Sequence, residues 1–143
     1  MKIGFGADHA GFALKEELKK YLEEKGHECI DYGTYSEQRV DYPDYGKKVA
    51  HALVEGEVEK GVLVCGSGIG ISISANKVKG IRCCVCSEPY SARMSVRHNN
   101  ANIIAMGGRI VGTDLAKMIV DEFFNSQFEG GRHEARVKKI EEE

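Results

Sequence analysis

The stretch VLVCGSGIG, from Val62 to Gly70, joins an uninterrupted apolar run to a glycine-rich loop. A short, continuous apolar run is typical of a central strand in a parallel sheet, because helices cover both faces of such a strand. Glycines let the backbone turn tightly and bring successive N–H groups to a common centre. The stretch therefore predicts a buried strand, a tight turn, and then a helix from Ile71 to about Lys77.

Short apolar runs and amphipathic segments alternate on both sides of this strand. We expect four further strands, at residues 3–5, 28–32, 81–86 and 102–106. Apolar residues recur at helical spacing between the strands, and Pro43 and Pro89 suit the first turn of a helix. This alternation predicts one α/β domain over residues 1–143, built on a doubly wound parallel sheet of five strands. The charged segment from Arg132 to Glu143 is expected to form a last helix that packs on a second subunit, because it offers few core residues.

The composition excludes several function classes. The chain has 143 residues, of which 42% are hydrophobic and 29% charged, and its net charge is -2. The chain lacks the excess of basic residues that would indicate a nucleic-acid or membrane-surface partner. It also has no apolar run long enough to span a bilayer. The N-terminus reads as a first strand and not as a signal peptide, so we expect a cytoplasmic protein. An odd number of cysteines, five, argues against a disulfide framework.

Polar and titratable residues stand beside three of the expected strands. The Asp8-His9 pair follows the first strand, Cys65 ends the central one, and Arg109 follows the last. Ligands of doubly wound sheets bind at the carboxyl ends of the strands, where the strand order switches. We expect these residues to form a site at that edge, together with the pair His98-Asn99, which precedes the last strand.

Cys65 is a candidate base or nucleophile because it stands directly before the loop from Gly66 to Gly70. A helix N-terminus and nearby donors, including the Ser67 hydroxyl, would stabilise its thiolate. The loop would bind an anion such as a phosphate or an enediolate oxygen. The pattern matches neither a dinucleotide-binding nor a nucleoside-triphosphate-binding motif.

Each of these features also has an ordinary structural interpretation. The glycine loop can be a plain strand-to-helix turn, and Cys65 can be one more buried cysteine. Asp8 can cap a helix, and the His98-Asn99 pair can simply end one. Arg132 and Arg136 share a helix face that could hold a phosphate, although such a pair is usually solvated. The other four cysteines complete no zinc pattern, and we expect neither a metal nor a cofactor.

Taken together, the motifs resemble the family of ribose-5-phosphate isomerase B and the galactose- and allose-6-phosphate isomerases, whose fold is a Rossmann-like three-layer α/β/α sandwich. They cover nearly the whole chain in order and include Asp8-His9-Ala10-Gly11-Phe12, Asp41-Tyr42-Pro43, Cys65-Gly66-Ser67-Gly68-Ile69-Gly70, Ala75-Asn76-Lys77, Gly80-Ile81-Arg82, Ser87-Glu88-Pro89-Tyr90, His98-Asn99 and Gly130-Gly131-Arg132-His133.

The resemblance implies a role for each motif. Cys65 resembles the base that moves a proton between C1 and C2 of an open sugar, assisted by Ser67. Some relatives use a glutamate after the loop, where this chain has Ile71. His98 resembles the group that opens the sugar ring, with Asp8 as a possible proton partner. The remaining implied roles are an enediolate hole (Gly66, Gly68, Ile69 and Gly70), a phosphate clamp (His9, Arg132 and Arg136, which Arg109 would join) and sugar contacts (Tyr42 and Asn99).

The resemblance also implies an assembly and a reaction. In the family the site forms between two subunits, so we expect a homo-oligomer, either a dimer or a tetramer. The reaction would interconvert ribose 5-phosphate and ribulose 5-phosphate through an enediolate, in the pentose phosphate pathway. The alternatives are an isomerase of allose or galactose 6-phosphate, a non-catalytic module that binds sugar phosphates or nucleotides, and a thiol redox protein. The redox alternative lacks a C-x-x-C motif at a helix start.

Overall fold

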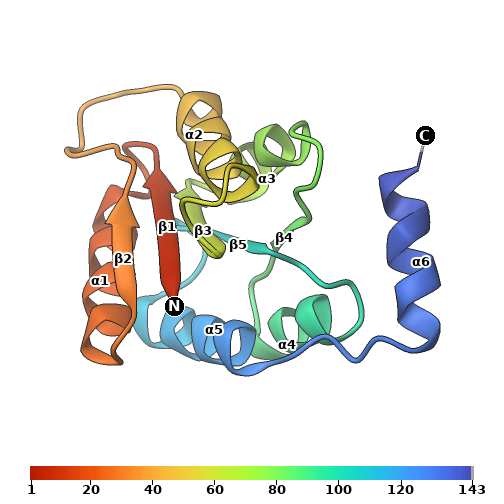
Figure 1. Ribbon diagram of the computed structural model, residues 1–143. Helices are drawn as coiled ribbons and strands as arrows, with labels where there is room; N and C mark the ends of the chain where they lie inside the picture. The colour runs from red at the N-terminus through yellow and green to blue at the C-terminus, as the bar shows by residue number, and fades with distance from the viewer. Residues whose placement is uncertain (143) are drawn as a thin grey trace.

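A computed structural model describes residues 1–142, which form one parallel sheet of five strands and six helices (Figure 1). The strands are β1 (Lys2–Ala7), β2 (Glu28–Asp31), β3 (Lys60–Cys65), β4 (Cys83–Val85) and β5 (Ile103–Gly107). The helices are α1 (Phe12–Glu24), α2 (Tyr42–Val54), α3 (Ile69–Asn76), α4 (Pro89–Arg97), α5 (Thr113–Asn125) and α6 (Arg132–Glu141). The strand order is β2-β1-β3-β5-β4, with every pairing parallel. The predicted doubly wound α/β fold is confirmed.

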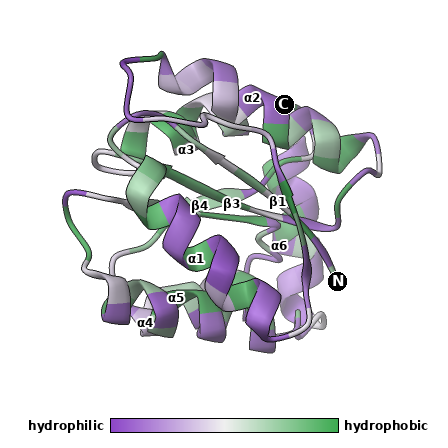
Figure 2. Ribbon diagram, turned by 90° about the vertical axis from the view of Figure 1, so that its left-hand side faces the viewer, coloured by the Kyte–Doolittle hydropathy of each residue, from purple (hydrophilic) through white to green (hydrophobic). Residues whose placement is uncertain are grey.

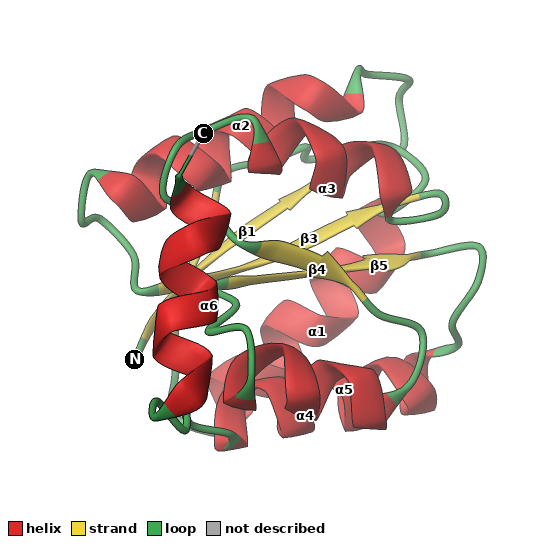
Figure 3. Ribbon diagram, turned by 90° about the vertical axis from the view of Figure 1, so that its right-hand side faces the viewer, coloured by secondary structure: helices red, strands yellow, loops and turns green. Residues whose placement is uncertain are grey.

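The sheet is the middle layer of three (Figure 3). Helices α2 and α3 lie on one face, and α1, α4 and α5 lie on the other. Along β3, Val62 and Val64 pack into the core with α1 and α5, whereas Leu63 and Cys65 pack into the core with α2 and α3. Burial on both faces explains why the strand is apolar without alternation, and Figure 2 shows the central strands mostly in the hydrophobic colour.

Among the element boundaries that differ from the sequence prediction, two have a clear cause in a hydrogen bond or a backbone conformation. Strand β4 covers only Cys83–Val85, because β4 is an edge strand and the Arg82 N–H donates to the Asn102 side chain at 2.8 Å. Helix α3 begins at Ile69, two residues earlier than expected, because Gly68 takes a left-handed conformation (φ +82°) and starts the helix directly. Hydrophobic periodicity reports neither side-chain caps nor backbone handedness.

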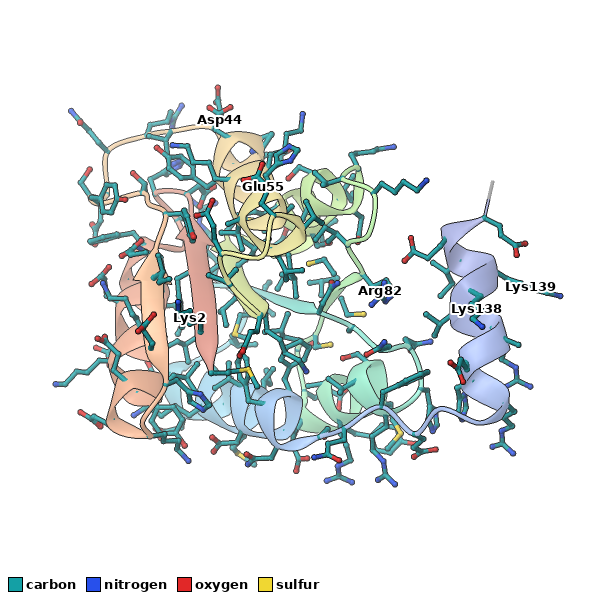
Figure 4. All side chains as sticks on the ribbon, viewed as in Figure 1. Lys2, Asp44, Glu55, Arg82, Lys138 and Lys139 are labelled. Atoms are coloured by element: carbon teal, nitrogen blue, oxygen red, sulfur yellow. The ribbon has the colours of Figure 1, made fainter. Side chains whose placement is uncertain are left out.

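Helix α6 stands apart from the sandwich, beside the β4 edge (Figures 1 and 3). Only His133 and Val137 of this helix are buried. Arg82 projects from the β4 edge toward α6 and pairs with Glu141 at 2.7 Å (Figure 4). Ile140 lines a cavity of about 360 Å³ and is still 57% exposed. The charged segment therefore forms the expected helix with little core of its own, and Glu143 lies outside the described residues.

Among residues 1–142, no helix is both long enough and apolar enough to cross a bilayer.

A buried lysine fixes α1 to the end of β2. Lys15 is fully buried, and its Nζ donates to both carboxylate oxygens of Asp31 at 2.7 Å and to the Thr34 carbonyl at 2.8 Å. Burial alone would raise the pKa of Asp31, but hydrogen bonds from Lys15, the Gly33 N–H and Lys19 lower it. The ion pair thus holds the loop after β2 against the helix that follows β1.

We expect Lys15→Met to lower the free energy of unfolding by about 3–5 kcal/mol, because it leaves the Asp31 carboxylate half-buried without its main partner. Lys20→Met is the matched control, since Lys20 lies on the same helix and is exposed. Urea unfolding at pH 7, followed by circular dichroism, measures both changes. Equal stability of the two variants would show that the buried pair contributes nothing.

Candidate active site

The carboxyl ends of three adjacent strands, β1, β3 and β5, lie side by side. Ala7 lies opposite Val64, and Cys65 lies opposite Gly107. The Asp8 N–H donates to the Val64 carbonyl at 3.2 Å, and the Arg109 N–H donates to the Gly66 carbonyl at 3.1 Å. These bonds hold the turns after β1, β3 and β5 together. A groove of about 500 Å³ opens here, lined by Tyr42, Cys65, Gly66, Ser67, Ile69, Gly70, Arg109 and Ile110.

The Cys65 thiol receives a backbone hydrogen bond from the loop that follows it. Its Sγ accepts from the Gly68 N–H at 3.2 Å, and the residue is only 4% exposed. Gly68 has a φ of +82°, and a Cβ at this position would lie 2.7 Å from the Met106 backbone. Only glycine therefore fits the turn that presents this N–H to the thiol. The thiol thus lies at the N-terminus of α3, beside a backbone N–H donor. The Ser67 Oγ accepts a further backbone hydrogen bond, from the Ile69 N–H at 3.2 Å.

The other four cysteines occupy apolar surroundings. Burial raises the pKa of Cys29 to about 11 and the pKa of Cys86 to about 12. Burial also raises the pKa of Cys83 and of Cys84. These four thiols therefore stay protonated near neutral pH, in agreement with their interpretation as ordinary core cysteines.

Two residues that line the groove, Tyr42 and Arg109, come from other segments, and His9 follows the neighbouring strand β1. The Tyr42 ring covers the loop so closely that a Cβ on Gly70 would lie 2.6 Å from it. The Arg109 guanidinium lies beside Gly66, with Nη1 3.3 Å from the position that a Cβ would take. His9 accepts a hydrogen bond from the Val40 N–H at Nδ1, at 3.2 Å, so its Nε2 is left to donate. Such donors suit an anionic ligand.

Asp8 is buried and closes the turn before α1. Its Oδ1 accepts from the Ala10 N–H at 3.0 Å and from the Gly11 N–H at 3.1 Å. These bonds close a turn ahead of α1, whose N-cap is Gly11 and has no side-chain cap bond, so the interpretation of Asp8 as a helix cap is wrong.

Within one chain, His98 and Asn99 lie at the amino ends of the parallel strands, whereas Cys65 lies at their carboxyl ends. They follow α4 and precede β5, which runs parallel to β3. Residues before a parallel strand lie at its amino end, and the five residues of β5 separate the two edges by about 16 Å. The prediction that this pair shares an edge with Cys65 is therefore wrong for a single chain.

His98 belongs to a second cluster, formed with α6 and the segment before it. Its ring stacks on the His133 ring, with centroids 4.2 Å apart and planes 10° apart. Glu129 Oε1 lies 3.7 Å from Nε2 of both histidines. Burial lowers the pKa of His133, and the charges of His98, Arg132 and Arg136 add to this effect. The chain thus carries two separate groups of candidate residues.

The sequence analysis assigned no role to Glu129 or to the His133 ring. His133 could have been found, because it stands in the Gly130-Gly131-Arg132-His133 motif. Glu129 offers no such signal, since it is one of many exposed acidic residues. The turn at Gly130 and Gly131, which both have positive φ, brings α6 back so that His133 reaches His98.

Comparison with known proteins gives consistent matches over the whole chain. A family model described as Ribose/Galactose Isomerase matches residues 3–140. The chain is 57% identical over 139 residues to ribose-5-phosphate isomerase B of Escherichia coli strain K12, covering 97% of this chain and 93% of the relative.

Comparison with solved structures gives the same family of proteins. The ribose-5-phosphate isomerase B of Clostridium thermocellum superimposes with a TM-score of 0.98 at 55% identity, covering 99% of this chain and 96% of that one. The Thermotoga maritima ribose 5-phosphate isomerase gives a TM-score of 0.97 at 51% identity, with coverages of 99% and 98%.

We expect Cys65 to be the first thiol that iodoacetamide alkylates at pH 8, because Gly68 donates to its Sγ while burial raises the pKa values of the other four. Peptide mass spectrometry over a time course measures the order of labelling. A phosphate-bearing ligand in the groove should slow the reaction at Cys65 alone. Faster labelling of Cys29, which is partly exposed, would contradict this reading of the thiols.

Proposed function

Because this chain belongs to the ribose/galactose isomerase family, we propose that it interconverts ribose 5-phosphate and ribulose 5-phosphate with Cys65 as the base. The enzyme is an aldose–ketose isomerase of the pentose phosphate route. The observation that carries the assignment of the base is the Gly68 N–H bond to the Cys65 Sγ, at the strand edge where ligands of such sheets bind.

The groove at Cys65 supplies what the proton shift needs. The thiolate takes the proton from C2 of the open aldose, and the electrons move onto the C1 oxygen to give an enediolate. The thiol then returns the proton to C1, and the proton of the C2 hydroxyl passes to the C1 oxygen, so that C2 becomes the ketone and C1 carries a hydroxyl. Backbone N–H groups at the start of α3 stabilise the negative oxygen during the step. The Ser67 hydroxyl borders the groove, where it assists this exchange.

We assign the other half of the site to a second copy of the chain. His98 and Asn99 cannot reach Cys65 within one chain, because they lie at the opposite sheet edge. Arg132 and Arg136 are exposed on α6, which stands off its own domain and carries little core. In a symmetric dimer each copy offers its His98 cluster to the partner's Cys65 groove, which gives two equal sites.

In this arrangement each predicted residue has a place. The partner's His98 opens the sugar ring and the partner's Asn99 holds a sugar hydroxyl. His9 and the partner's Arg132 and Arg136 bind the phosphate, and Arg109 joins them. Gripping the phosphate at a distance from the reacting carbons uses remote binding energy to hold C1 and C2 in place. Asp8 shapes the loop that carries His9 and does not act on the sugar ring.

Two alternatives differ from this proposal in what they require of Cys65. A module that only binds sugar phosphates uses the loop and the arginines but not the thiol. A six-carbon sugar phosphate would use the same machinery, and one extra carbon changes binding by only about 1–3 kcal/mol. A thiol redox protein is disfavoured by the raised pKa values of the four remaining cysteines. All five cysteines are free thiols, in keeping with a cytoplasmic enzyme.

We expect Cys65→Ala to lower kcat on ribose 5-phosphate by about 10²–10⁴-fold, the usual contribution of an acid–base group, while the protein still binds the sugar phosphate. The assay compares ribose, allose and galactose phosphates for parent and variant, and calorimetry measures binding. A variant that isomerises at the parent rate would remove Cys65 from the mechanism. A preference for a six-carbon phosphate would keep the mechanism and change the substrate.

We expect Cys65→Ala and His98→Ala to complement each other when both chains are produced together. A mixed dimer has one site with both lesions and one intact site, so random pairing restores roughly a quarter of the sites. Activity of each variant alone and of the purified mixed dimer measures the effect. The matched control combines Cys65→Ala with Ser67→Ala, two lesions in one half, which should leave the mixed dimer without an intact site. Absence of rescue by His98→Ala would place both residues in one chain's site.

A further inference from the structure

The cluster of His98, Glu129 and His133 has the composition of a metal site. Two imidazoles and one carboxylate converge, and their candidate ligand atoms all lie within 4.8 Å of one another. Imidazole nitrogen and carboxylate oxygen are ligands that Zn²⁺ takes in proteins. We propose that these three residues bind a divalent transition-metal ion, Zn²⁺ above all, and that the bound ion inhibits the isomerase. The inhibitory part rests on the proposed function, in which His98 opens the sugar ring.

The observed spacing is close to that of a zinc site with three protein ligands. Bond lengths of about 2.0–2.1 Å in a tetrahedron put neighbouring ligand atoms about 3.3 Å apart. Glu129 Oε1 is 3.7 Å from Nε2 of His98 and 3.7 Å from Nε2 of His133. The two pairs that include Glu129 therefore have to close by only a few tenths of an ångström, and all three ligand atoms lie within 4.8 Å of one another. Water would take the fourth position.

One ring has to turn when the ion binds. A metal ion lies in the plane of each imidazole that ligates it, whereas the two rings are stacked with planes 10° apart. His133 is buried at the start of α6 and keeps its place. The His98 side chain is 39% exposed and ends α4, so it can tilt until its plane meets the ion. Binding thus couples the ion directly to the orientation of His98.

Glu129 is held in position before any ion arrives. Its N–H donates to the Arg97 carbonyl at 3.0 Å, and its Oε2 accepts from the Arg97 Nε at 2.9 Å. Oε1 is left facing the two imidazoles. Such an outer partner orients a ligating carboxylate, as the residues around metal sites generally do.

Nearby positive charge limits the affinity of the site. Arg97 is already neutralised by Glu129, whereas Arg132 and Arg136 are exposed on α6 and repel a cation through solvent. The ion should therefore bind reversibly, and a chelator should remove it. While bound, it occupies the lone pair with which His98 would exchange a proton with the sugar.

The binding test titrates chelator-treated, full-length protein with Zn²⁺ by calorimetry. We expect one ion per chain. Glu129→Gln and His133→Gln should each weaken binding by at least about 10-fold, since even the loss of an outer partner costs that much. His51→Gln is the matched control, because His51 is an exposed histidine on α2, and it should bind Zn²⁺ like the parent. Unchanged affinity in Glu129→Gln and in His133→Gln would overturn the site.

Cys65 is the competing explanation, because a thiolate also binds zinc. We expect Cys65→Ala to keep one Zn²⁺ per chain with parental affinity. Co²⁺ as a spectroscopic probe should show visible ligand-field bands without a thiolate-to-cobalt charge-transfer band. Loss of the ion in Cys65→Ala, or a thiolate band in the parent, would overturn the proposal.

The activity test measures isomerisation of ribose 5-phosphate against Zn²⁺ concentration. Inhibition should follow the binding curve, be reversed by EDTA, and shift by at least about 10-fold in Glu129→Gln. Zn²⁺ bound at the cluster without inhibition would overturn the inhibitory role. An active enzyme that binds no Zn²⁺ would overturn the site and leave the proposed function standing. A protein that shows no isomerase activity but binds Zn²⁺ through the cluster would overturn the proposed function and leave the metal site standing.

Discussion

The parallel pairing of β3 with both β1 and β5 is the constraint on which the rest of the structure depends. It buries both faces of β3, so polar chemistry can occur only where the strand ends. It also sets Cys65 opposite Gly107, so the turns after three strands meet at one groove. A register slip of one residue would exchange the two faces and remove the thiol from its place beside the Gly68 N–H.

Sequence patterns were sufficient where burial alone decides the structure. The run Val62–Val64 predicted a central strand, and alternation along the chain predicted the sheet and its helices. The patterns failed where a hydrogen bond or a backbone conformation sets the boundary, as at Gly68 before α3 and at Asn102 beside β4. They also assigned His98 to the wrong end of the parallel strands. His98 was expected beside Cys65, but a residue that precedes a parallel strand lies at its amino end.

The parts of the candidate site that could be predicted are those whose residues are adjacent in sequence. Cys65 and its loop are adjacent in sequence, so a strand end and a glycine turn were enough to single them out. Glu129 is distant from His98 in the chain, and only the turn at Gly130 and Gly131 brings α6 back to make the contact. The Ser67 hydroxyl shows a further limit, because sequence does not reveal that its Oγ accepts from the Ile69 N–H.

The separation of the two clusters to opposite edges of one sheet has a consequence in genetics. In a symmetric pair that shares its sites this way, an allele that alters Cys65 still supplies an intact His98 cluster to a normal partner. The reverse holds for an allele that alters His98. Two defective alleles can therefore support each other when they fall in different halves, and cannot when they fall in the same half. After a gene duplication, each copy would be free to lose one half, and the two products would become dependent on pairing with each other.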